Sequence, residues 1–548
     1  MDVAARDKRL ALLACILGST VVGIDGSAIG VALPAIRGEL GGGLAGQQWA
    51  ANAYLLTLGS LLLLGGSLGD AYGERRIFTL GLVGFGVTSL ICAAAPTIEI
   101  LIAGRALQGA AGALLVPAAL AVIVSVFEAD ERSRAIGTWA AWSGIGAALG
   151  PLVGGQLVDA ASWRWVFALN VPLVALTIAL IVRAIPAAEG RRARLDVVGS
   201  VLCVVGLSGV TFGLIQQPIA GWGAASVLGP LAVGATIFAA FVAYERRVPA
   251  PLVPLELFNR RNFALGNAQT LVLYAGMALL FFYGVIYVQQ VAGWTALEAG
   301  LSLVPVTIVM MLAASRFGAL ANRHGPRAFT VAGPLVMGLG LLLLLRLDRD
   351  VSYVGELLPA VTVFALGLSI VVAPQTAVVL ADAEERNAGA ASGVNNAIGR
   401  IAALLGVAGF GLVIATGFSA ELDRRLDPDR LSPAARVAVA DAKGNPMTQS
   451  DLRAVPAAER PAIGRAIGEA SVSGLHLGAG SAAGIAFLAG LLGAGLRNPR
   501  RAVKARECAG GALVAAPRDA ARRPEECARE RDRAGNGSDL VSSVTGAP

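Results

Sequence analysis

The feature that most constrains this chain is a series of apolar segments, each long enough to cross a lipid bilayer. A hydrocarbon core of about 30 Å requires about 20 apolar residues in a helix, and a bilayer admits few other backbone structures. Segments of this length lie at about 10–35, 49–69, 77–96, 100–126, 136–158, 165–183, 196–216, 225–244, 264–289, 298–320, 328–346, 356–380, 389–417 and 472–495. The sequence therefore predicts an all-α integral membrane protein with fourteen transmembrane helices.

The composition agrees with this prediction and argues against several functional classes. Of 548 residues, 55% are hydrophobic and 15% are charged, and the mean hydropathy is +0.68. The cysteines show no disulfide or zinc spacing, His324 and His476 are the only histidines, and no GxxxxGK nucleotide loop occurs. We expect no metal, no cofactor and no ATP hydrolysis, so an ion gradient is the expected energy source. An integral membrane enzyme is the least supported class.

Arginine is distributed unequally between the predicted loops. With the N-terminus inside, the inner loops carry Arg75, Arg76, Arg132, Arg134, Arg183, Arg191, Arg192, Arg194, Arg246, Arg247, Arg260, Arg261, Arg323, Arg327 and Arg386. The short outer loops carry only Arg37, Arg164, Arg346 and Arg349. This bias predicts cytoplasmic termini, and it accounts for the net charge of +7 without nucleic acid. The Ala, Arg and Gly bias favours a bacterial inner membrane.

One charged motif, GSLGDAYGERR, follows the second segment at its predicted inner end. Asp70, Arg75 and Arg76 can form ion pairs between helices around the turn at Gly73 and so hold one conformation shut. The alternative is a solvated turn whose arginines only orient the chain. We therefore predict a conformational latch here.

A weaker copy of this motif, GALANRHGPR, runs from Gly318 to Arg327, eight helices later. It has Asn322 where the first copy has Asp70, so its latch should be weaker. The repeat predicts two six-helix bundles, at 1–185 and 263–496, separated by two inserted helices at 186–262. A polar outer loop at 418–471 is long enough for a short helical hairpin, and 497–548 has the composition of a disordered tail.

The fifth segment contains GIGAALGPLVGG. Glycines at every fourth position form a face that permits close helix packing, and a proline within the string removes a backbone donor. These residues are Gly146, Gly150, Pro151, Gly154 and Gly155.

Together these motifs resemble the major facilitator superfamily, in particular its fourteen-helix drug:proton antiporters. The resemblance covers about residues 10–415 and the last helix, and it includes IDGSAIGVALP, RALQGAAGA, WRWVFALNVP, PLELFNRRNF, YVQQVAGWTALEAGL and ASGVNNAIGR. It implies the major facilitator fold, and the glycine string resembles the antiporter motif of exporters. Ala71, in place of the usual basic residue, and Asn322 depart from the family pattern and put the strength of the latch in doubt.

Ionisable residues deep in a bilayer are the best markers of a site, because burying an unpaired charge is costly. Asp25 lies about 22 Å along the first helix at 1.5 Å per residue, and Arg105 enters the fourth helix from the outer side. Both therefore lie in the outer half, where we predict a proton-coupling pair. A permanent ion pair that only holds the helices together is the alternative.

Candidates for the substrate cavity are less specific, because each is more often a packing or interface residue. They are Gln108, Trp142, Gln269, Tyr274, Tyr283 and the deep Arg400. For Arg400 the sequence offers no acidic partner, and backbone carbonyls, an anion or lipid headgroups remain open.

The leading hypothesis is a monomeric secondary transporter that exports small hydrophobic or cationic compounds, such as drugs and antibiotics, by proton antiport with alternating access. The alternatives are a dedicated exporter of one endogenous metabolite or antibiotic, and a membrane sensor that does not transport.

Overall fold

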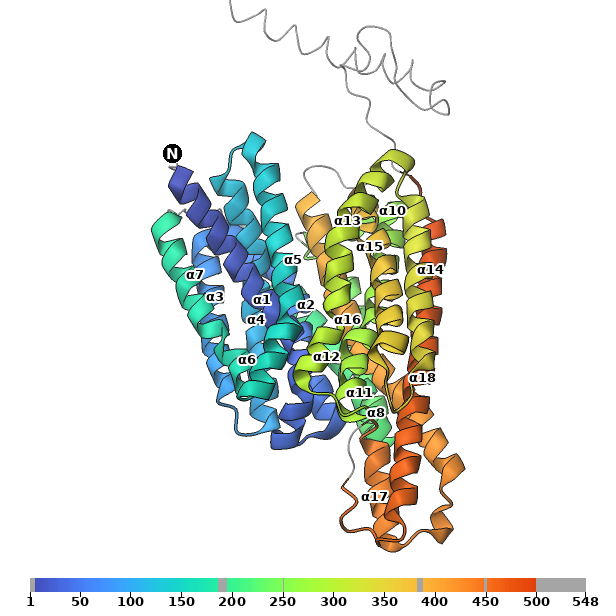
Figure 1. Cartoon of the computed structure of the whole chain (residues 1–548). Helices are drawn as coiled ribbons and strands as arrows, with labels where there is room; N and C mark the ends of the chain where they lie inside the picture. The colour runs from blue at the N-terminus through green and yellow to red at the C-terminus, as the bar shows by residue number, and fades with distance from the viewer. Residues whose placement is uncertain (1–4, 186–194, 250, 382–387, 448–450, 499–548) are drawn as a thin grey trace, which may run out of the picture. The chain divides into compact units, whose positions relative to one another are not determined.

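The computed structural model describes residues 5–185, 195–249, 251–381, 388–447 and 451–498, and among these residues it contains helices and no strand (Figure 1). Thirteen helices of this described part are long and apolar enough to cross a membrane. The remaining predicted span, 136–158, falls within α5 (Ala129–Ala160), a continuous helix of 32 residues. The predicted all-α membrane fold is confirmed. The tail predicted at 497–548 lies outside the described residues from residue 499 onward.

The first bundle gathers the helices up to residue 184. It consists of α1 (Ala5–Leu40), α2 (Gly43–Tyr72), α3 (Glu74–Ala93), α4 (Ile98–Val126), α5, α6 (Arg164–Ala168) and α7 (Asn170–Ala184). In this bundle α1 packs against α5 and α7, while α4 packs against α2 and α3. Its apolar core is built largely from Val, Leu, Phe and Ala side chains of these helices.

The second bundle begins after a 3-10 turn, η1 (Leu255–Asn259). It contains α10 (Arg261–Ala278), a π-helical stretch η2 (Leu279–Gly284), α11 (Val285–Gln290), α12 (Ala296–Ser302), α13 (Val304–His324), α14 (Arg327–Leu343), η3 (Leu344–Arg346), η4 (Tyr353–Leu357), α15 (Leu358–Ala381), α16 (Ala388–Arg425) and α18 (Arg460–Ala494). Helices α10, α16 and α18 pack against one another, and α14 packs against α15 and α18.

Two helices lie between the bundles in the sequence, α8 (Val197–Ala220) and α9 (Ala225–Glu245). Glycines bring their backbones together: a Cβ on Gly206 would lie 2.8 Å from the Phe238 nitrogen, and one on Gly209 would lie 2.8 Å from the Gly234 Cα. Helix α8 also contacts α2 and α16, which belong to different bundles. The inserted pair therefore packs beside a contact between the two halves.

The sequence repeat has a matching backbone. Gly73 adopts φ 93° and ψ 131° after α2, and Gly325 adopts φ 90° and ψ 140° after α13. Each donates its N–H to the carbonyl four residues earlier, at 2.9 Å for Gly69 and 2.8 Å for Ala321. Side chains other than glycine rarely adopt this region of φ, so both copies require glycine at the turn.

The predicted outer loop is helical in the structure. Helices α16 and α18 extend far beyond the length that a bilayer requires, and α17 (Pro433–Gly444) packs against both. Ten buried apolar residues form a small core of their own between them, centred on Phe418, Leu422 and Ile463. We call the described part of this segment, residues 418–447 and 451–471, the cap. Asn445, which follows α17, accepts a hydrogen bond from the Leu44 nitrogen at 3.2 Å, so the cap contacts the first bundle.

The two bundles meet along α2 and α16 and also at the ends of α1, α5 and α12. Asp159 at the end of α5 accepts hydrogen bonds from the first amides of α12, at 3.1 Å from Ala296 and 2.7 Å from Leu297. Arg37 at the end of α1 donates to Gln290 at 3.0 Å. These contacts lie at the end of the bundles remote from the N-terminus (Figure 1).

Candidate functional site

Asp25 lies inside the first bundle with no exposed surface. Its Oδ2 accepts a hydrogen bond from Arg105 Nη1 at 2.5 Å. Its Oδ1 accepts two amide hydrogen bonds at 2.9 Å, from Gln108 Nε2 and Asn170 Nδ2. Residues from α1, α4 and α7 thus meet at one carboxylate, and the predicted proximity of Asp25 and Arg105 is observed.

Arg105 is also fully buried, and its charge is distributed over several partners. Nη1 donates to Gln108 Oε1 at 2.7 Å, and Nε donates to the Ala50 carbonyl at 3.0 Å. The guanidinium carbon lies 4.2 Å from the centre of the Tyr54 ring, within the range of a cation–π interaction. Its Nη2 has no hydrogen-bond partner among the described residues. One negative and one positive charge therefore compensate each other, and neither side chain has exposed surface.

A second layer of polar groups orients the amides. Ser89 on α3 is fully buried, and its hydroxyl accepts from Gln108 Nε2 at 2.9 Å and from Asn170 Nδ2 at 3.2 Å. A glycine of α4 allows the close approach of α3, since a Cβ on Gly104 would lie 2.8 Å from Cys92 Sγ. Such hydrogen bonds offset part of the cost of burying the ion pair, although Arg105 Nη2 and Asn170 Oδ1 have no partner among the described residues.

Sequence reasoning did not identify Ser89 or Asn170 as members of this network. Asn170 stands within the quoted motif WRWVFALNVP, and an amide inside an apolar segment is the signal that could have indicated it. Gln108, predicted as a cavity residue, is fully buried, and its hydrogen bonds go to Asp25, Arg105 and Ser89. In this structure it belongs to the charge network.

The glycine string of α5 packs against two other helices, one on each of two faces. Cβ atoms on Gly146 and Gly154 would lie 2.5 Å from Thr20 Cγ2 and 2.8 Å from Ala28 Cβ, and one on Gly150 would lie 2.8 Å from the Ile24 carbonyl, all on α1. Gly155 faces the other bundle, where its Cβ would lie 2.5 Å from the Ala296 carbonyl.

Pro151 belongs to this second face, because its backbone is what a Cβ on Gly300 of α12 would meet. The glycine string thus contacts α1 within the first bundle and α12 across the interface.

The predicted latch is not closed by an ion pair between described residues. Asp70 and Arg76 are exposed and have no ion-pair partner in this part of the chain, and Arg75 Nη2 reaches the Val182 carbonyl at 3.5 Å. Gly73 provides the turn. The latch therefore remains a prediction, and this conformation would have it open.

The other predicted cavity residues lie in different surroundings. Gln269 is buried and donates to the carbonyls of Thr330 at 2.7 Å and Ala489 at 2.9 Å, which ties α10 to α14 and α18. Tyr283 is buried and receives a hydrogen bond from Gln48 of α2 at 2.6 Å. Trp142 is 54% exposed, whereas Tyr274 and Arg400 are half-buried. No contact among the described residues joins these five into one site.

Tyr274 and Arg400 are nevertheless near each other. A Cβ on Gly399 would lie 3.5 Å from the Tyr274 ring, and Arg400 is the next residue on α16.

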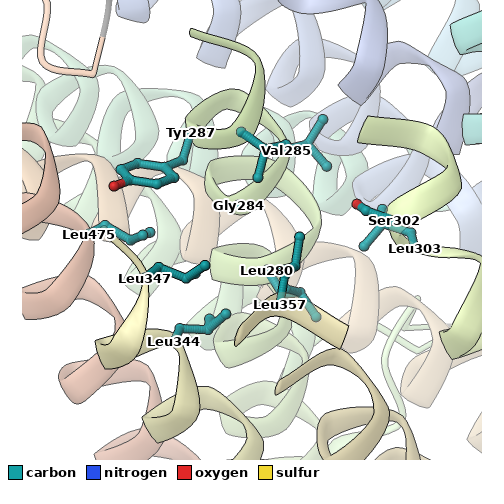
Figure 2. Close-up of a pocket in the computed structure, with 11 residues that line it drawn as sticks. Leu280, Gly284, Val285, Tyr287, Ser302, Leu303, Leu344, Leu347, Leu357 and Leu475 are labelled. Atoms are coloured by element: carbon teal, nitrogen blue, oxygen red, sulfur yellow. The ribbon is translucent and has the colours of Figure 1, made fainter. Parts of the chain in front are cut away.

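Two apolar cavities lie in the second bundle. One, of about 10 Å³, is lined by leucines around Gly284 and Tyr287 (Figure 2). It has room for about one water molecule, and its lining offers almost no polar group. The other, of about 350 Å³, lies between α10, α16 and α18 and is lined by residues such as Leu271, Phe410 and Leu488. Neither is lined by Asp25 or Arg400, so neither explains the charged residues.

Comparisons with known proteins agree with this architecture. A family model described as Major Facilitator Superfamily matches residues 15–407. The chain is 36% identical over 419 residues to a probable actinorhodin transporter of Streptomyces coelicolor, covering 74% of this chain and 72% of that protein. It is 36% identical over 403 residues to a puromycin resistance protein of Streptomyces alboniger, covering 72% and 80%.

Among solved structures, a bacterial homolog of the human lysosomal transporter Spinster, in an inward-facing and unoccupied conformation, has a similar fold. The TM-score is 0.62 at 16% sequence identity, covering 91% of this chain and 100% of that chain.

Proposed function

The chain belongs to the Major Facilitator Superfamily, and from that premise we propose that it exports small hydrophobic or cationic organic compounds, drugs and antibiotics among them, by proton antiport. Membership makes it a multi-pass membrane transporter of small molecules and not an enzyme. We further propose a bacterial inner membrane, cytoplasmic termini and function as a monomer. With that orientation, the bundles are in contact at the outer end.

The observation that carries the proton coupling is the fully buried Asp25. A proton on its carboxylate would cancel the attraction to Arg105, while Gln108, the Ala50 carbonyl and the Tyr54 ring would still hold the arginine. Loading and release of one proton would then change how tightly α1 is held to α4. Because α1 also packs on the glycine face of α5, this change reaches the helix that contacts the second bundle.

A dedicated exporter of one compound is the second candidate. Several relatives carry the name of a single antibiotic, including a cephamycin export protein of Amycolatopsis lactamdurans at 36% identity and a tetracenomycin C resistance and export protein of Streptomyces glaucescens at 33% identity. A narrow response in a compound panel would favour this candidate.

Proton release from acidified inverted vesicles, followed with a pH-sensitive dye, tests the proposal. The panel contains tetraphenylphosphonium, puromycin and fluorescein. We expect Asp25→Asn to remove most of the compound-induced proton release while the protein stays in the membrane. The matched control is Asp451→Asn, which changes an exposed acid of the cap. Unaltered proton release in Asp25→Asn would contradict the proposed role of Asp25 in proton coupling.

A further inference from the structure

Arg400 lies near mid-depth of its membrane helix. The candidate span containing it starts at Ala390, so ten residues at 1.5 Å each place Arg400 about 15 Å along the helix, half of a core of about 30 Å. A Cβ on Gly59 of α2 would lie 2.9 Å from Arg400 Cβ. The arginine therefore leaves α16 on the side that meets the first bundle.

The charge of Arg400 is not compensated. Its guanidinium has no ion pair or hydrogen bond with any residue that the structure describes, whereas Arg105 is paired with Asp25 at 2.5 Å. An isolated cation at this depth is expensive unless it lines a hydrated cavity or meets an anion. Among the described residues, Arg400 thus presents an unpaired positive charge to the region between the bundles.

Polar residues continue from Arg400 along one face of α16. Ser392 and Asn396 are exposed and precede it by eight and four residues, a spacing that places all three on the same side of a helix. Hydroxyl, amide and guanidinium groups in hydrocarbon would lack partners, so this face is suited to a water-filled route. These polar residues extend from the N-terminal end of α16 to the arginine.

Aromatic and amide groups lie around the same point. Tyr274 is half-buried beside Gly399, the residue before Arg400. Asn52 on α2 is fully buried, and neither its side-chain nitrogen nor its oxygen has a partner among the described residues. It precedes Gly59 by seven residues, two helical turns, and therefore shares the face of α2 that meets α16.

We propose that Arg400 binds the anionic group of the substrate, and that the transported class is aromatic compounds bearing a carboxylate or an ionised phenol. Arginine forms paired, charge-assisted hydrogen bonds with such groups, and Tyr274 supplies a ring surface beside Gly399, the neighbour of Arg400. This assignment rests on the proposed export function and narrows it to hydrophobic anions instead of cations. The phosphate of a lipid headgroup offers the same chemistry, but the mid-membrane position favours a substrate.

Binding to the purified full-length protein in detergent tests this assignment without requiring transport. The probes are fluorescein, an anion, and rhodamine 123, a cation on the same type of ring system, both followed by fluorescence anisotropy. We expect Arg400→Gln to weaken fluorescein binding about tenfold or more, with no loss for rhodamine 123. Arg400→Lys should be intermediate, because it keeps the charge but not the forked geometry. The control Arg316→Gln removes an exposed arginine of α13 and should bind as wild type.

Competition with phosphatidylglycerol separates the two sources of the anion. If that lipid, but not anthraquinone-2-carboxylate, displaces fluorescein, the site binds headgroups and the substrate assignment fails. The substrate assignment is also overturned if folded Arg400→Gln binds fluorescein with the same affinity as wild type. It is overturned as well if neither fluorescein nor anthraquinone-2-carboxylate binds saturably to wild type.

The proposed function can fail separately. Loss of fluorescein binding in Arg400→Gln together with normal proton release in Asp25→Asn would keep the anion site and remove the coupling role. Normal fluorescein binding in Arg400→Gln together with impaired proton release in Asp25→Asn would keep the coupling role and remove the anion site.

Discussion

The two bundles share a repeated turn but differ in how their buried polar side chains are paired. In the first bundle, Asp25 and Arg105 are opposite charges that neutralise each other among amides and a serine hydroxyl. In the second, Thr270 Oγ1 accepts from Gln375 at 2.7 Å and from Asn395 at 2.8 Å, a neutral cluster near the uncompensated Arg400. In our proposal the first bundle exchanges a proton, and the second presents a fixed charge and neutral hydrogen-bonding groups.

Removing one member of the charged pair should have the largest effect. Arg105→Ala leaves the Asp25 carboxylate buried without its cation, which costs about 3–5 kcal/mol in the free energy of unfolding. We expect poor recovery of folded protein and no transport. Thermal unfolding in detergent measures the loss. The double variant Asp25→Asn with Arg105→Gln removes both charges and should recover much of the stability; strictly additive losses would contradict a coupled pair.

A bulky residue in the glycine face of α5 comes next. Gly150→Leu would drive a side chain into Ser27 and the Ile24 carbonyl of α1, so we expect transport to fall more than tenfold. The control is Gly144→Leu on the same helix, because a Cβ there meets nothing within 4 Å. Uptake of a fluorescent substrate into inverted vesicles compares the two. Equal activity would remove the packing role of the string.

The contact between the bundles at Asp159 should have an intermediate effect. Asp159→Ala removes the acceptor for two amides of α12, and each lost hydrogen bond is worth about 1 kcal/mol. We expect the bundles to separate at this end in a larger fraction of molecules. Spin labels at Ala161 and Leu301 measure that distance, in a background with Cys508 and Cys527 replaced by serine. Asp159→Asn keeps one acceptor oxygen and should shift less; no shift in Asp159→Ala would contradict the closing role.

The neutral cluster should give the smallest effect on coupling. Thr270→Val removes the hydroxyl that accepts from Gln375 and Asn395, at a cost of about 1 kcal/mol in stability for each lost hydrogen bond. Each amide keeps a second acceptor, the Gly266 carbonyl for Gln375 and Asn267 Oδ1 for Asn395. The pH dependence of transport should stay that of wild type, because no titrating group is changed. Thermal unfolding and vesicle assays at several pH values test both parts. A changed pH profile would place proton coupling in the second bundle as well.

Particular residues show how far the sequence could be taken. Asp25 and Arg105 were predictable partners because each is a rare deep charge, and their depths follow from counting along two helices. Ser89 and Asn170 were not, because a serine or asparagine in an apolar segment is common and gives no sign of its rotation about the helix. Gln108 was assigned to the cavity for the same reason, and only the packing of α1, α3, α4 and α7 showed its partners.

The sequence by itself determined the all-α membrane fold, the repeat and the family, because hydrophobic length, charge bias and glycine turns are local properties of the chain. Tertiary structure decided which faces meet. It divided the glycine string between α1 and α12, completed the shell around Asp25 and left Arg400 unpaired beside α2. Those outcomes depend on the rotation and depth of helices far apart in sequence, and side-chain packing across the whole bundle sets both.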